Sequence, residues 1–106
     1  MPLRPKSPPA RGRPRGATSF DADVAAAFGS VVREGRLAAR VSQETLAQLA
    51  DVERSYYGRL ERGESQPTLS VLLKICSALG ADSATIVGLV EDNLRRARRS
   101  IDRKPI

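Results

Sequence analysis

The segment from Ser42 to Gly63 constrains the fold of this 106-residue chain most strongly. Ser42 precedes Gln-Glu-Thr, a pattern typical of a helix N-cap. Gly63 follows a second polar–apolar run, at a position that suits the left-handed residue ending a helix. Between these runs, Asp51-Val52 is too short for anything but a tight turn. The spacing therefore predicts two short helices, one opening at Ser42 and one spanning residues 53–62.

Small side chains on the first of these helices fit a close crossing with the second. Its predicted buried face consists of Leu46, Ala47 and Ala50. Two helices that cross steeply leave room only for small residues where they meet, which is the requirement of a helix-turn-helix. A small helical bundle without any DNA role produces the same pattern. The pattern alone therefore leaves both interpretations open.

Three further apolar stripes recur at helical spacing. The first predicts a helix that Thr18 or Ser19 caps, with Asp21 and Asp23 in its first turn, and that ends near Ala39; its stripe is Phe20, Val24, Phe28, Val31 and Val32. The second predicts a helix from Thr68 to Gly80, with a buried face of Leu69, Leu72, Leu73, Cys76 and Leu79. The third begins near Asp82 or Ser83, with Ile86, Val90, Leu94, Ala97 and Ile101 along one side.

No segment alternates as a strand does, so the predicted class is all-α, a five-helix bundle that contains a helix-turn-helix. Five of the seven prolines lie within residues 1–16, which have almost nothing to bury. We therefore expect residues 1–17 to form a disordered basic tail and residues 18–81 a helical domain that contains the helix-turn-helix pattern. We expect residues 82–106 to form a C-terminal helix with a basic end that serves for dimerisation, and we expect no effector domain after it.

The net charge of +6 is unevenly distributed. Residues 1–16 contain five basic residues and no acidic one, and residues 94–106 contain six basic residues and one acidic. The stretch between them contains seven basic and eleven acidic residues. The expected globular core is thus mildly acidic, and the two ends carry the basic excess that suits a polyanion.

Several functional classes are excluded by what the sequence lacks. It contains no histidine and a single cysteine, Cys76, which we assign to the core. The commonest general base is therefore missing, no nucleophile–base pair, metal cluster or disulfide framework is expected, and the protein is predicted to be no enzyme and to need no cofactor. No apolar run approaches the length of a membrane span, and the start lacks a secretory signal. We expect a cytoplasmic, nucleoid-associated protein.

Spaced motifs over residues 24–80 resemble the Cro/phage-repressor family of helix-turn-helix regulators, the xenobiotic-response-element type. The matching residues are Arg33, Arg36, Ser42-Gln43-Glu44, Leu46-Ala47, Ala50, Val52, Leu60-Glu61-Arg62-Gly63, Pro67-Thr68-Leu69, Leu72 and Ala78-Leu79-Gly80. Three positions depart from the family: Arg40-Val41 and Asp51 replace usual glycines, and Glu53 replaces the usual Ser or Thr cap. We interpret Glu53 as weakening non-specific DNA binding rather than accepting from a cytosine.

The resemblance implies that the helix over residues 53–62 lies in the major groove of DNA. It implies base-edge contacts for Arg54, Ser55 and Arg59. It implies phosphate contacts for Gln43, Tyr56, Arg62, Gln66 and Thr68; for Tyr56, a contact with a thymine methyl and a plain surface role are the alternatives. It also implies a structural ion pair between Arg36 and Glu61, and a packing role for Tyr57 with its hydroxyl at the rim.

The N-terminal run Arg11-Gly12-Arg13-Pro14, followed by Arg15, resembles an AT-hook. An extended Arg-Gly-Arg-Pro strand fits the narrow minor groove of A·T-rich DNA. A generic basic tail is the alternative. The C-terminal run from Arg95 to Arg99 is interpreted either as the cationic end of a helix or as a further nucleic-acid contact.

The sequence thus predicts a repressor or controller that binds double-stranded DNA as a homodimer on a palindromic operator. Dimerisation is expected through the fourth and fifth helices, because paired half-sites require two-fold symmetry. The alternatives are an antitoxin or a protein-interaction adaptor, in which binding of a partner protein is primary. No small-molecule effector and no membrane contact are expected.

Overall fold

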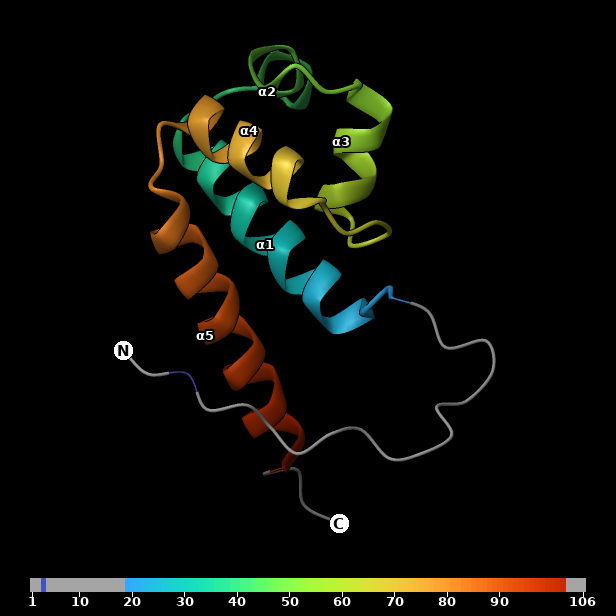
Figure 1. Ribbon diagram of the computed structural model, residues 1–106, viewed down its shortest axis with the longest axis vertical. Coiled ribbons are helices and arrows are strands. Elements are labelled where there is room, and N and C mark those ends of the chain that lie inside the picture. The colour runs from blue at the N-terminus through green and yellow to red at the C-terminus, as the bar shows by residue number, and fades with distance from the viewer. Residues whose placement is uncertain (1–2, 4–18, 103–106) are drawn as a thin grey trace.

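The computed structural model of the chain describes residue 3 and residues 19–102. These residues form five helices: α1 (Ala22–Ala38), α2 (Gln43–Ala50), α3 (Arg54–Glu61), α4 (Leu69–Leu79) and α5 (Ser83–Asp102). Figure 1 shows α1 at the centre, with α5 along it and with α2 and α3 at one end. No strand occurs within the described residues, so the predicted all-α class is confirmed. The AT-hook-like run from Arg11 to Arg15 lies outside them, as does the rest of the expected tail (residues 1–17) except residue 3.

Asp21, rather than Ser19, caps α1. Its carboxylate accepts hydrogen bonds from the amides of Asp23 and Val24, at 3.0 and 3.1 Å. The prediction of Ser19 as the N-cap is therefore wrong, and the alternative, Thr18, lies outside the described residues. Phe20 precedes the helix and is 43% exposed, so it is not part of the buried stripe. Asp and Ser are about equally good N-caps, so residue type alone does not distinguish the two positions.

The caps of α2 and α4 are the predicted ones. The hydroxyl of Ser42 accepts from the Thr45 amide at 3.0 Å, and that of Thr68 accepts from the Val71 amide at 3.2 Å. Each bond satisfies one of the amides that the first turn of a helix leaves unpaired. The start of α3 differs, because Glu53 stands at its N-cap position without a side-chain capping bond.

Four helices end in the same way, with one residue in the left-handed conformation. These residues are Arg40, Asp51, Gly63 and Gly80, with φ of 59°, 57°, 74° and 66°. The amides of that residue and of the next one bond back to the last turn; at α3, Gly63 bonds Leu60 and Glu64 bonds Arg59. Arg40 and Asp51 adopt this geometry without glycine's freedom, which explains how the turns form where the family usually has glycine.

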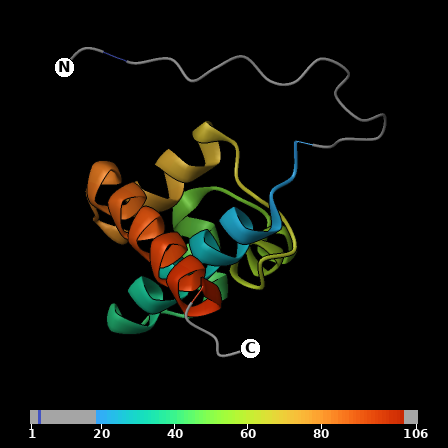
Figure 2. The ribbon, with the colours of Figure 1, turned by 90° about the horizontal axis from the view of Figure 1, so that it is seen from below.

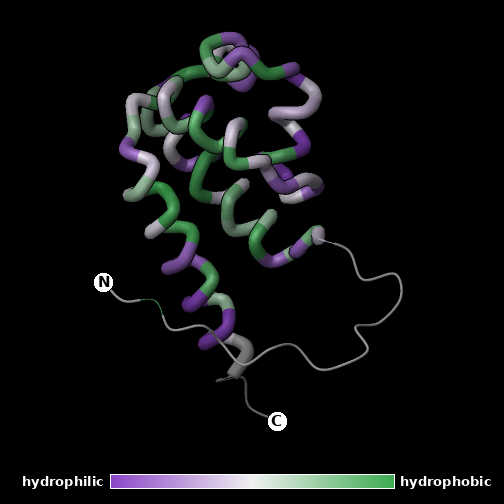
Figure 3. Tube along the Cα trace, in the orientation of Figure 1, coloured by the Kyte–Doolittle hydropathy of each residue, from purple (hydrophilic) through white to green (hydrophobic). Residues whose placement is uncertain are grey.

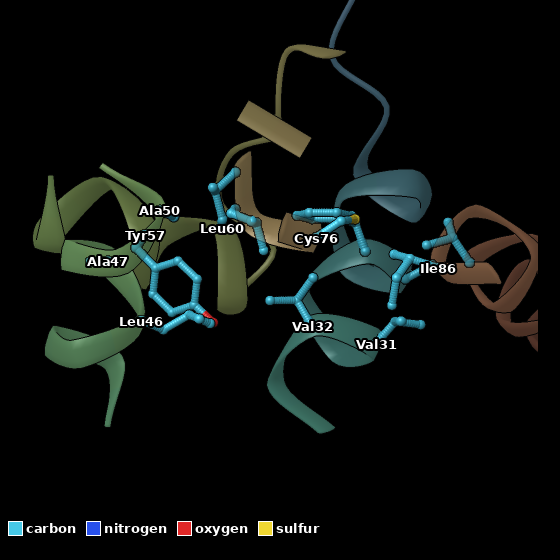
Figure 4. Close-up of a cluster of buried hydrophobic side chains, with 13 residues drawn as sticks. Val31, Val32, Leu46, Ala47, Ala50, Tyr57, Leu60, Cys76 and Ile86 are labelled. Carbon is cyan, nitrogen blue, oxygen red and sulfur yellow. The ribbon is translucent and has the colours of Figure 1, made fainter. Parts of the chain in front are cut away.

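One apolar cluster joins all five helices (Figure 4). Its largest fully buried side chains are Tyr57, Phe28, Leu46, Leu60, Ile75, Val32 and Cys76. The predicted buried face of α2, Leu46 with Ala47 and Ala50, is confirmed. Colouring by hydropathy shows green segments where α1 and α4 meet the other helices (Figure 3).

The prediction for α4 was partly wrong. Ile75 and Cys76 are buried, whereas Leu69 is 72% exposed and Leu73 is 48% exposed. Apolar residues surround most of this helix, so their spacing does not identify a single face. The packing of α4 against α2 and α5 selects the side that carries Ile75.

The C-terminal helix packs along α1 and belongs to the same core. Ile86 and Val90 of α5 are buried, Leu94 packs against the cluster, and Ala97 is exposed. The expected role of Ile101 falls on a side chain outside the described ones. No single helix of the described part is long and apolar enough to cross a membrane; α4 and α5 meet that condition of length and composition only as a pair bent by 108°.

Gly29 sets the distance between α1 and α3. A Cβ at position 29 would lie 2.5 Å from the carbonyl oxygen of Leu60 and 2.6 Å from that of Glu61. Such distances are below any normal contact, and both atoms belong to backbone that cannot rotate away. Only glycine therefore allows the end of α3 to lie directly against α1.

We predict that Gly29→Ala destabilises the fold by about 1–3 kcal/mol, the usual cost of overpacking. Urea-induced unfolding measures the effect. Gly88→Ala in α5 is the matched control, because a Cβ there meets nothing within 4 Å. Since alanine favours helix over glycine, the control should gain roughly 0.5–1 kcal/mol. Equal stability of Gly29→Ala and the native protein would contradict the close approach.

Candidate nucleic-acid interface

The eight residues of α3 divide into a buried face and an exposed face. Tyr57, Gly58, Leu60 and Glu61 are buried against α1 and α2. The three predicted base-reading residues, Arg54, Ser55 and Arg59, are all exposed. The structure therefore presents them together on the outer side of a helix whose inner side is held by the core.

The two arginines of this exposed face differ in their surroundings. The Arg59 guanidinium lies over the Tyr56 ring, 5.6 Å from its centroid, a cation–π contact that restricts its direction. Tyr56 is half-buried and packs against the core cluster, so the ring that Arg59 contacts is itself fixed in place. Arg54 has no ion pair with any described residue. Both guanidiniums are thus open to an external acceptor.

The third predicted base-reading residue, Ser55, is hydrogen-bonded to an acidic side chain. The Ser55 hydroxyl donates to the Glu53 carboxylate, at the start of α3. Ser55 must break that bond before it can contact a base. The carboxylate also places a negative charge beside Arg54, at the end of the helix where a negative charge interacts favourably with the helix dipole.

Arg62 is likewise paired. Its guanidinium donates two parallel hydrogen bonds to Glu64, at 2.9 and 3.1 Å, and both side chains are more than half exposed. The hydrogen bonds raise the pKa of Arg62 and lower the pKa of Glu64 from their ordinary values. A phosphate contact by Arg62 therefore requires Glu64 to be displaced.

The other predicted phosphate contacts are bonded within the protein. Gln43 donates from Nε2 to Glu61 at 2.9 Å. Gln66 accepts from the Asp21 amide at 2.8 Å and donates to the Ser19 carbonyl at 2.9 Å, which ties the start of α1 to the loop before α4. The hydroxyl of Thr68 caps α4. In this state the three side chains hold the fold and do not point freely outward.

Beneath the exposed face lies the Arg36–Glu61 ion pair. Arg36 of α1 donates from Nε to one carboxylate oxygen of Glu61 at 2.5 Å and from a terminal nitrogen to the other at 3.1 Å. It also donates to the Val41 carbonyl at 2.9 Å. The hydroxyl of Tyr57 donates to Glu61 at 2.5 Å. Tyr57 is fully buried, so the expectation that its hydroxyl lies at the rim was wrong.

These contacts set the ionisation of the cluster. Burial alone would raise the pKa of Glu61, but the hydrogen bonds from Arg36, Tyr57 and Gln43 together outweigh it and lower the pKa below its ordinary value. The hydrogen bond to Glu61 raises the pKa of Arg36. Burial and the bond to Glu61 raise the pKa of Tyr57. Glu61 and Arg36 are thus both charged and Tyr57 is neutral over the physiological range.

Three features of this cluster were not predicted from the sequence. They are the close approach at Gly29, the bond from Gln43 to Glu61 and the buried hydroxyl of Tyr57. A signal existed for two of them: a glycine inside an otherwise apolar helical stripe, and a tyrosine where the family has an aliphatic residue. The described residues contain no group of His, Cys, Asp or Glu that could hold a metal ion.

Comparison with known proteins places this arrangement in a common fold. A family model described as a helix-turn-helix domain matches residues 27–86. The solved structure of the clp gene regulator ClgR from Corynebacterium glutamicum is 26% identical, with a TM-score of 0.71 over 74% of this chain and 84% of that one. The restriction-modification controller protein C.AhdI from Aeromonas hydrophila is 41% identical, with a TM-score of 0.59 over 62% of this chain and 98% of its own.

A third solved structure includes DNA. The restriction-modification controller protein C.Esp1396I, a tetramer in complex with its natural 35-base-pair operator, is 21% identical. The match has a TM-score of 0.62 over 67% of this chain and 93% of that one, and at this identity it shows a shared fold. No curated protein sequence matches the chain significantly.

We predict that Glu61→Gln makes stability less sensitive to acid. The pKa of Glu61 is lower when folded than its unfolded value of about 4.3, so its contribution is complete above that value and is lost as the pH falls through the folded pKa. At pH 7 the variant should be less stable by roughly 3 kcal/mol, because it leaves Arg36 buried without its counter-charge.

Urea unfolding between pH 7 and pH 2.5 tests this prediction. The gap between the native protein and Glu61→Gln should narrow once the pH falls below about 4. The exposed Glu64→Gln removes the same charge and should change stability little at any pH. A gap for Glu61→Gln that stays constant down to pH 2.5 would refute the role assigned to the charged pair.

Proposed function

The chain belongs to the helix-turn-helix family of DNA-binding transcriptional regulators, in the Cro/phage-repressor type, and we propose that it acts as a dimer on a palindromic operator with α3 in the major groove. One observation carries this proposal. The helix that the family uses for reading presents Arg54 and Arg59 outward, while its inner face is fixed by the buried Arg36–Glu61 pair.

Arginine is the side chain best suited to read guanine. Its planar fork donates two hydrogen bonds to O6 and N7 in the major groove. Arg54 stands at the first turn of α3 and Arg59 lies more than a turn further along the helix. We assign base reading to both, with Ser55 as a further contact once its hydroxyl leaves Glu53.

The contacts to phosphate are assigned mainly to groups around α3. The N-terminus of α2, at Gln43, offers backbone amides and a helix dipole that favour a phosphate. Arg62 joins it by exchanging Glu64 for the DNA backbone. Tyr56, Gln66 and Thr68 complete the proposed set, the last two chiefly through their backbone, because their side chains are bonded within the fold.

The proposed dimer uses apolar side chains that α4 and α5 leave exposed. These are Leu69, Leu73, Val87 and Leu89. Two-fold symmetry places two copies of α3 about one turn of DNA apart, so the operator should consist of inverted half-sites. We further assign Arg11 to Arg15 to the minor groove beside the operator, and the protein to the cytoplasm as a nucleoid-associated regulator.

Selection of bound duplexes from a random pool tests the function. The native chain should enrich inverted half-sites with centres about 10 base pairs apart. Arg54→Ala and Arg59→Ala should each relax one position of the half-site, with a loss of about 1–3 kcal/mol of discrimination. Binding titrations on the selected site and on variants of each position measure this loss.

Lys74→Ala is the matched control for these variants. It removes the same charge from an exposed position of α4, outside the proposed contacts, and should leave the selected sequence unchanged. Failure to enrich any sequence, or the same preference after both arginines are replaced, would refute reading by α3. A chain without DNA preference that acts through a protein partner would instead be an adaptor or antitoxin.

We predict that Glu64→Gln tightens DNA binding. The change frees the Arg62 guanidinium and removes a negative charge beside the proposed phosphate contact. Affinity at low salt should rise roughly fivefold for operator and non-operator duplexes alike, because phosphate contacts carry no sequence information. Glu91→Gln removes an exposed acid of α5 instead and should have a smaller effect. Unchanged affinity of Glu64→Gln would remove Arg62 from the phosphate contacts.

A further inference from the structure

The C-terminal end of α5 continues beyond the core that holds the rest of the helix. Leu94 is the last side chain of α5 that packs against the apolar cluster. The next six residues, from Arg95 to Ser100, are helical and all exposed. Packing thus stabilises the first half of α5, but it does not account for the following turns.

These turns carry a dense positive charge. Arg95, Arg96, Arg98 and Arg99 lie within five residues, and we call them the α5 arginine cluster. Arg95 donates to Asp92 at 3.0 Å, with both side chains more than half exposed, and this is the one ion pair of the cluster within the described residues. Like charges three or four residues apart on a helix repel each other. The cluster therefore favours an external anion.

The cluster lies away from α3. In Figure 1, α2 and α3 are at one end of the molecule and the last turns of α5 are at the other. Seen from below, in Figure 2, the end of α5 lies in front and projects toward the viewer. A duplex held by α3 in the way proposed above therefore leaves the arginine cluster free.

We propose that the α5 arginine cluster is a second DNA-binding site, which contacts the phosphate backbone of a duplex other than the one that α3 reads. Arg95, Arg98 and Arg99 share one side of the helix by their three- and four-residue spacing, with Arg96 beside them. Guanidinium groups match phosphate oxygens with two parallel hydrogen bonds each. Such contacts require no particular base sequence.

The composition of these turns favours DNA over other anionic partners. From Arg95 to Ser100 the only apolar side chain is that of Ala97. A protein interface needs a desolvated apolar centre, and a helix that lies on a lipid surface needs an apolar face to insert. A row of phosphates needs only charge and hydrogen-bond donors. The cluster provides these and lacks the other two features.

The consequence is that one protein molecule can hold two DNA segments. The inference rests on the proposed function for the first segment, because α3 must retain the operator. The second site adds a non-specific segment, nearby on the same DNA or on another molecule. In this arrangement the regulator joins its operator to flanking DNA.

The experiment uses the full chain and two duplexes. Protein is loaded on an immobilised operator duplex, and capture of a second, labelled duplex of unrelated sequence is measured. Arg98→Gln with Arg99→Gln should leave operator retention within about twofold and reduce capture roughly ten- to hundredfold. In solution, the salt dependence of binding to the unrelated duplex should flatten by about 1.8 log units per log of salt, for two lost phosphate contacts.

Matched single variants control for net charge. Arg99→Gln should reduce capture, and Lys74→Gln, which removes one charge from α4, should not. Deletion of residues 1–16 tests the other basic segment of the chain. Capture that survives Arg98→Gln with Arg99→Gln, or that is lost only on that deletion, would overturn the proposal.

Two further measurements distinguish DNA from other polyanions as the ligand, and failure of the second site from failure of the proposed function. Polyglutamate that competes with the labelled duplex as well as DNA does, charge for charge, would overturn the assignment of this site to DNA. The solution titration needs no operator, so a loss of salt dependence in the cluster variant supports the second site even if selection finds no operator. Normal selection with unchanged salt dependence would instead refute the second site and leave the proposed function intact.

Discussion

The rest of the structure depends on one buried carboxylate. Glu61 of α3 accepts hydrogen bonds from Arg36 of α1, from Gln43 of α2 and from Tyr57 of its own helix. Arg36 in turn donates to the Val41 carbonyl in the linker between α1 and α2. Apolar contact alone would allow α3 to slide or rotate on the core, whereas these bonds are directional. They therefore fix where the exposed face of a short helix points.

The eight residues of α3 form two faces of different chemistry, one buried in the core and one exposed. The inner face combines an apolar cluster with a charged group, and the charge is tolerated because every described buried polar side-chain atom has a partner. The outer face carries two open cations, Arg54 and Arg59, and the residue that follows the helix, Arg62, is held by Glu64. Glu53 and Glu64 flank α3 with negative charge, and we propose that this charge opposes non-specific binding to phosphate. The site is thus a positive face between two acids, not a uniformly basic surface.

Charge is also unevenly divided along the whole chain, between the helix-turn-helix and the two ends. The helix-turn-helix itself is not the source of the net positive charge, which belongs to the two ends. Sequence reading relies on few, well-oriented donors, whereas attraction to DNA relies on charge that needs little orientation. The α5 arginine cluster is held away from the core by a helix. In our proposal it therefore directs part of that attraction toward a second duplex.

The sequence by itself determined the helices and their caps at Ser42 and Thr68, because capping and periodicity are local signals. Its spaced motifs carried the resemblance to the family, and that resemblance implied the pairing of Arg36 with Glu61. It did not determine which side of α4 is buried, where the hydroxyl of Tyr57 lies, or that α1 meets α3 at Gly29. An all-round apolar helix has no preferred face until its neighbours pack on it. A polar group in the core has no partner until distant segments meet. Tertiary structure alone brings those segments together, and so it alone decided how the reading helix is held.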